Sequence, residues 1–92
     1  QTEHEVQAAS LAVSRARGDF LAVADVRLNE LDKKLATMKK DKTVKKDWVE
    51  IDRLRADTEQ VRTGIRSNAK LYTLETQRKF EDLVSKIDEL LR

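Results

Sequence analysis

The apolar residues of this chain follow a helical period along almost its whole length, and the period stops once, between Lys39 and Asp47. Before this stretch, apolar residues recur every three or four positions up to Met38, and the same spacing resumes at Val44. Such spacing places residues on one face of an α-helix. We therefore expect a helix on each side of the stretch and a turn within it.

The composition favours long helices that meet along a narrow apolar seam. The chain has 92 residues, no proline and two glycines, so few positions would break a helix. Charged residues make up 39% and aromatic residues 4%, which leaves mainly Leu, Val, Ile and Ala for a core. We predict a single all-α domain over residues 1–92, folded as a long antiparallel two-helix hairpin with coiled-coil-like packing. Its helices would span about residues 2–40 and 44–91, with the turn at about 40–43 and Thr43 as the second N-cap.

A three-helix bundle is the alternative. In that fold the second arm breaks near residues 64–68, after Gly64, and Ser67 or Asn68 caps a third helix. The break would leave helices of about 38, 23 and 23 residues, which match poorly in length. In the hairpin, by contrast, apolar residues of the two arms face each other along the whole overlap, with Leu31 near Ile51. We favour the hairpin for this reason.

The hairpin leaves two groups of apolar residues without a partner. The end of the second arm extends past the first arm, and three leucines point away from the seam at one level of the rod. Exposed apolar patches of this kind usually mark contact surfaces. We therefore expect the chain to form a homo-oligomer or to bind another helical protein. The residues predicted to carry these contacts are Leu11, Leu71, Leu74, Phe80, Leu83, Val84, Ile87, Leu90 and Leu91.

The turn is rich in lysine and contains few acidic residues. A lysine cluster at one end of a rod would suit acidic lipid, nucleic acid or an acidic protein. Lysines also stabilise a helix C-terminus and keep an exposed end soluble, and we favour this simpler explanation. The overall charge of +2 also argues against a dedicated nucleic-acid binder. The candidate anion contacts are Lys39, Lys40, Lys42, Lys45 and Lys46.

No residue pattern points to catalysis, a metal or a cofactor. The absence of cysteine excludes disulfides, thiolate metal sites and cysteine nucleophiles. The one histidine, His4, lies between Glu3 and Glu5, which do not share its helix face. No phosphate-binding loop and no catalytic signature is found. We therefore predict that the chain is not an enzyme and takes no cofactor or small-molecule substrate.

The sequence does not indicate a compartment. No apolar run approaches the ~20 residues that span a bilayer, so we predict no transmembrane segment. The first residue is Gln1 rather than Met, which suggests a processed chain, such as an exported one, or a segment of a longer protein. The leading hypothesis is a self-associating structural or protein-interaction module, such as a scaffold or spacer of a cell envelope. The alternative is a module that binds anionic surfaces through its lysine-rich turn.

Overall fold

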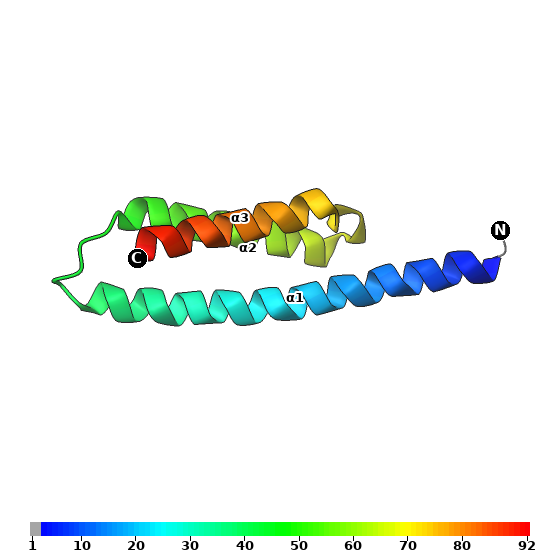
Figure 1. The fold of residues 1–92 in the computed structure, drawn as a ribbon, viewed down its shortest axis with the longest axis horizontal. Helices are drawn as coiled ribbons and strands as arrows, with labels where there is room; N and C mark the ends of the chain where they lie inside the picture. The colour runs from blue at the N-terminus through cyan, green and yellow to red at the C-terminus, as the bar shows by residue number, and fades with distance from the viewer. Residues whose placement is uncertain (1–2) are drawn as a thin grey trace.

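The computed structural model describes the backbone of residues 3–92 and the side chains of residues 14–92. The described chain contains three α-helices, which confirms the all-α prediction: α1 (Glu3–Lys40), α2 (Trp48–Ser67) and α3 (Leu74–Leu91), with a short 3₁₀ helix, η1 (Ala69–Leu71), before α3. As Figure 1 shows, α2 runs antiparallel to α1, and α3 turns back along both. The molecule is a rod that measures 62 × 20 × 18 Å.

The first helix ends where the apolar period stops, and residues 41–47 are non-helical. Asp41 Oδ1 accepts hydrogen bonds from the backbone N–H of Thr43 at 2.9 Å and from its hydroxyl at 2.6 Å. This local turn competes with a further helical turn. Asp47 then caps α2, because its Oδ1 accepts a hydrogen bond from Glu50 N at 3.2 Å. The predicted N-cap at Thr43 is therefore wrong, and α2 begins at Trp48, after a longer turn than expected.

The second arm is two helices rather than one. α2 ends at Ser67, and Thr73 begins α3 with a reciprocal capping box. The Thr73 hydroxyl accepts from Thr76 N at 3.1 Å, and the Thr76 hydroxyl accepts from Thr73 N at 3.0 Å. The predicted continuous helix over 44–91 is wrong at residues 68–73, just after the break considered near 64–68. Thr76, which continues the helical spacing of the apolar residues, serves as part of this cap.

Folding back lets α3 bury the apolar residues that a two-helix hairpin would leave exposed. Full burial of a large apolar side chain contributes about 1.5–3 kcal/mol, so several such residues outweigh the cost of a break. The difference in helix length is no obstacle, because the long α1 packs against both shorter helices. The shared core consists of Ala24, Leu28, Leu31 and Leu35 from α1, Ile51 and Leu54 from α2, and Phe80, Leu83, Val84, Ile87 and Leu91 from α3.

The turn between α2 and α3 packs closely against its neighbours. The Phe20 ring of α1 lies 5.8 Å from the Tyr72 ring and 5.5 Å from the Phe80 ring, centroid to centroid, with an edge-on contact to Phe80. At Gly64, an added Cβ would lie 3.3 Å from Leu71 Cδ1. Glycine at this position therefore lets η1 fold tightly onto the end of α2. Gly18 has no such neighbour within 4 Å, as expected for a surface glycine.

Candidate interaction surfaces

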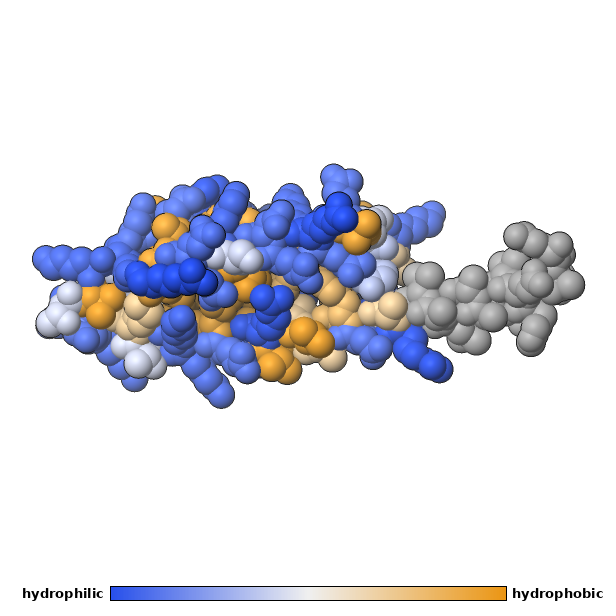
Figure 2. All heavy atoms as spheres, in the orientation of Figure 1, coloured by the Kyte–Doolittle hydropathy of each residue, from blue (hydrophilic) through white to orange (hydrophobic). Residues whose placement is uncertain are grey.

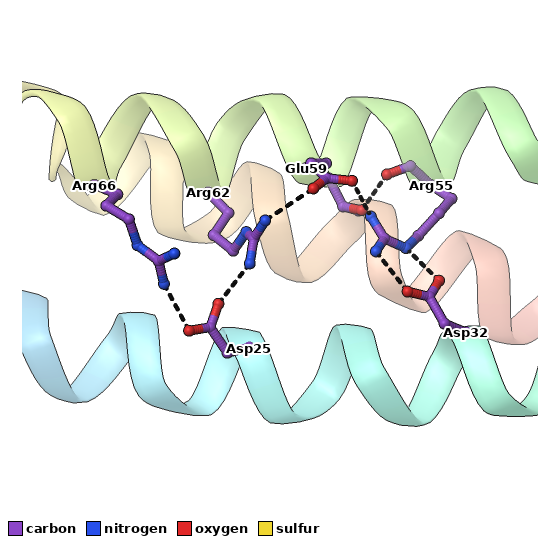
Figure 3. Close-up of polar contacts among 7 residues, drawn as sticks. Asp25, Asp32, Arg55, Glu59, Arg62 and Arg66 are labelled. Carbon is purple, nitrogen blue, oxygen red and sulfur yellow. Dashed lines mark hydrogen bonds and ion pairs between the residues drawn. The ribbon is translucent and has the colours of Figure 1, made fainter.

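A cluster of ion pairs joins α1 to α2 along one side of the core, as Figure 3 shows. Both carboxylate oxygens of Asp32 accept hydrogen bonds from Arg55, from Nε at 2.8 Å and from Nη2 at 2.9 Å. This two-point geometry fixes the position of one helix along the other. Arg55 also donates to Glu59 at 3.1 Å, one turn further along α2. In the first half of the cluster, Arg55 of α2 therefore binds Asp32 of α1 and is itself held in place by Glu59 of α2.

The second half of the cluster is centred on Asp25. Its two oxygens accept from Arg62 Nη1 at 2.7 Å and from Arg66 Nη2 at 2.6 Å (Figure 3). The hydrogen bond from Arg62, and then that from Arg66, holds the pKa of Asp25 below its ordinary value, although partial burial opposes this. Close by, Arg17 donates to the carbonyl oxygens of Ile65 at 2.9 Å and Arg66 at 2.7 Å. These bonds satisfy carbonyls at the end of α2 that lack helical partners.

The ion-pair cluster could have been found from spacing. Asp25 and Asp32 are seven residues apart, and so are Arg55 and Arg62. In paired helices, charges at this spacing lie beside the seam and meet across it. The sequence interpretation did not pair these charged residues across the seam.

The opposite side of α1 faces α3 across an open groove of about 220 Å³. Leu31 and Val84, both buried, form its apolar floor. Charged side chains surround the floor, and no ion pair joins α1 to α3 among residues 14–92. On the face of the rod in Figure 2, hydrophobic residues are visible between hydrophilic residues over these two helices. The charged lining residues are Arg27, Glu30 and Lys34 of α1 and Asp88 of α3.

Exposed apolar side chains lie near the groove. Val23 is 58% exposed and precedes Arg27 by one turn, so it lies on the groove side of α1. Val26, one turn before Glu30, is 55% exposed. Leu74 is 62% exposed, but it lies at the start of α3, ten residues before Val84, and so away from the groove. The sequence interpretation predicted exposure for Leu74 but did not single out the two valines. Both valines are exposed because the helical spacing places them away from the core residues Ala24 and Leu28 of the same helix.

The predicted contact residues divide into two groups. Most of the apolar residues expected to extend past the first arm are buried in the chain's own core, so that expectation is wrong because α3 folds back. Leu71 and Leu90 stay exposed together with Leu74, while Leu11 and His4 lie outside the side chains that the structure describes. The buried residues are Phe80, Leu83, Val84, Ile87 and Leu91.

The lysines of the turn divide in the same way. Lys39 Nζ pairs with Asp52 at 2.7 Å and lies 5.6 Å from the centre of the Trp48 ring. Lys46 Nζ donates to the backbone oxygen of Arg92 at 2.6 Å. These two lysines therefore hold the end of the rod together. The lysines that are exposed and make no ion pair or side-chain hydrogen bond within residues 14–92 are Lys40, Lys42 and Lys45.

The part of the chain that the structure describes contains no metal site and no membrane-spanning helix. Within that part of the chain, no group of three or more His, Cys, Asp and Glu residues is placed to hold a metal ion. No described helix has the length and apolar character needed to cross a membrane, in agreement with the sequence. Comparison of the chain with known protein families, curated proteins and solved structures gives no match.

Proposed function

We propose that the chain is a three-helix bundle that acts as a non-catalytic protein-interaction module and pairs with a second copy of itself. The observation that carries this proposal is the open groove between α1 and α3. Its floor of Leu31 and Val84 is apolar, and Val23 and Val26, each one turn before a residue that lines the groove, are more than half exposed. A groove with exposed apolar neighbours suits a protein partner.

Charge complementarity favours a second copy as that partner. Arg27 and Lys34 line the groove on α1, and Asp88 lines it on α3 at the same level of the rod. A two-fold axis parallel to the rod would place α1 of each copy against α3 of the other. The basic side chains of one copy would then meet Asp88 of the second copy, twice by symmetry.

The available area supports a weak dimer. α3 is roughly 27 Å long at 1.5 Å per residue, and the rod is about 20 Å wide. The groove side therefore offers roughly 500 Å² in projection per copy, near the lower limit for a specific interface. Burial of Val23 and Val26 beside the groove floor would supply the apolar centre. We expect reversible association that depends on concentration.

Sedimentation velocity over a wide concentration range tests the proposal. The wild-type chain should shift from monomer to dimer, and Val23→Glu should stay monomeric because it places a charge in the apolar centre. Val49→Glu is the matched control, since Val49 is even more exposed and lies on α2, which contributes no residue to the groove. It should dimerise like the wild type. A wild-type chain that stays monomeric at every concentration would overturn the proposal.

Exchanged charges test the orientation of the two copies. Asp88→Lys alone should weaken the dimer, and so should Arg27→Glu combined with Lys34→Glu, because each homodimer would then place like charges together. Mixing the two variants should restore association, since every contact between them is again between opposite charges. Failure to form the mixed dimer would contradict the parallel two-fold arrangement.

A further inference from the structure

A second surface lies at the end of the rod where α1 passes into α2, and it shares no residue with the groove. Residues 39–47 contain five lysines and two aspartates. We propose that this end binds the surface of a bilayer that contains anionic lipid. The contact residues are Lys40, Lys42, Lys45 and Val49, which we call the lysine tip.

The charge of the lysine tip is available to a partner. Lys40, Lys42 and Lys45 are exposed and have no ion pair within the described side chains. The two aspartates between and after them are occupied within the turn, since Asp41 accepts from Thr43 and Asp47 caps α2. Lys39 and Lys46 hold the turn in place through their own bonds. The three free lysines therefore project from a braced turn rather than balancing nearby carboxylates.

An exposed apolar residue follows these lysines in the chain. Val49, in the first turn of α2, is 82% exposed, the largest value among the exposed large hydrophobic residues of the described chain. Leu90, near the end of α3 at the same end of the rod, is 37% exposed. Lysines beside apolar side chains suit the boundary between lipid headgroups and acyl chains, where both kinds of group find favourable surroundings.

The same features favour a bilayer over nucleic acid. Strand recognition relies on aromatic stacking and on arginine contacts to base edges. The turn contains no arginine, and Trp48 is partly buried beneath Lys39. The free lysines also gather at the end of a rod about 20 Å across rather than along its side. If the rod contacts a flat surface with this end, all three lysines can reach that surface. A nucleic-acid strand would instead need basic residues arranged in a longer row.

Cosedimentation of the full chain with vesicles tests the proposal. Vesicles of phosphatidylcholine alone are compared with vesicles that also contain phosphatidylserine, and only the second should bind. Each lysine near an anionic surface changes the partition coefficient about fivefold, so Lys40→Gln, Lys42→Gln and Lys45→Gln together should lower it about a hundredfold. Val49→Ser should lower it by roughly fivefold. Added salt should weaken wild-type binding.

A variant with the same change in net charge serves as the control. Lys70→Gln, Arg78→Gln and Lys79→Gln remove three exposed basic residues that lie away from the tip. This variant should bind anionic vesicles like the wild type. Equal losses in both triple variants would show attraction through net charge alone and would overturn the proposal, as would no binding at low salt.

Binding to duplex DNA that is tighter than binding to vesicles would assign the tip to nucleic acid instead. Val23→Glu should leave vesicle binding by the monomer unchanged, which separates this result from the groove.

Discussion

The two sides of α1 differ in how they meet their neighbours. Toward α2, Asp25 and Asp32 are each held by arginines at distances of 2.6–2.9 Å. Toward α3, Arg27, Lys34 and Asp88 line a groove, and no ion pair crosses it in the described part of the chain. Charged residues of similar kinds thus form ion pairs between α1 and α2 but line an unpaired groove between α1 and α3. The α2 side therefore fixes the register between helices, whereas no described ion pair fixes α1 to α3 on the other side.

Ion pairs alone do not account for the attachment of α1. Pairs exposed to water contribute about 0–1 kcal/mol each, and Asp25 and Asp32 are both more than one-third exposed. The arginines are better covered, with side-chain exposures of 16% for Arg55 and 20% for Arg62. An arginine covered to this degree is costly to leave without its carboxylate. The cluster therefore mainly disfavours alternative alignments of α1 along α2, in which these arginines would lose their carboxylates. The apolar core supplies most of the stability.

The largest expected effect comes from the core between the two sides. Leu28 is 2% exposed and packs within the shared core. Leu28→Ala should lower the free energy of unfolding by about 2–5 kcal/mol, because it removes apolar contacts and leaves a cavity. Urea denaturation followed by circular dichroism measures the change. Leu74→Ala, the same substitution at an exposed leucine, should cost less than about 1 kcal/mol. Equal losses at the two positions would contradict the core described here.

A smaller effect should separate the two sides of α1 directly. Asp25→Asn should cost about 1 kcal/mol, since it weakens two charge-assisted hydrogen bonds and leaves Arg62 with less compensation. Asp88→Asn, on the groove side, should change stability by less than about 0.5 kcal/mol. Both are measured by urea denaturation at low protein concentration, where self-association does not contribute. A larger loss from Asp88→Asn would show that the groove side also holds α1.

The smallest effect concerns pH. The pKa of Asp25 is lower in the folded chain than its ordinary value of 3.8, so the stability contributed by its ionised form is complete above that value. This contribution is lost as the pH falls through the lower folded pKa. The stability difference between the wild type and Asp25→Asn should therefore be constant near neutral pH and shrink below about pH 4. Denaturation curves at several pH values check this, and a difference independent of pH would contradict the pairing.

Much of the secondary structure could be predicted from local signals. The apolar period and the absence of proline indicate helices, and the gap in the period at residues 39–47 contains the non-helical residues 41–47, although the expected turn, about 40–43, was shorter. The second break was harder, because Tyr72 and Thr76 continue the helical spacing. The threonine pattern that caps α3 is a local signal, but it competes with that period. Whether this cap forms and divides the arm depends on whether α3 can bury its apolar residues after it turns back.

The surfaces were less predictable than the helices. The lysine-rich turn is evident from sequence, but only the folded chain shows that Lys39 and Lys46 are bonded while Lys40 is free. The groove could not be derived, because its walls come from helices that are brought together by the unexpected turn. Val23 and Val26 appear in the sequence as ordinary apolar helix residues.

The sequence by itself determined that this protein is helical and rich in charge and that its first helix ends near Lys40. These features follow from the sequence because spacing, propensity and capping act over a few residues. The tertiary structure alone decided that the second arm divides and that Phe80 and Ile87 enter a shared core. It also decided which face of α1 is locked by arginines and which is open. The physical reason is that burial and ion pairing depend on residues far apart in the chain. Their balance is set only when all three helices are in place.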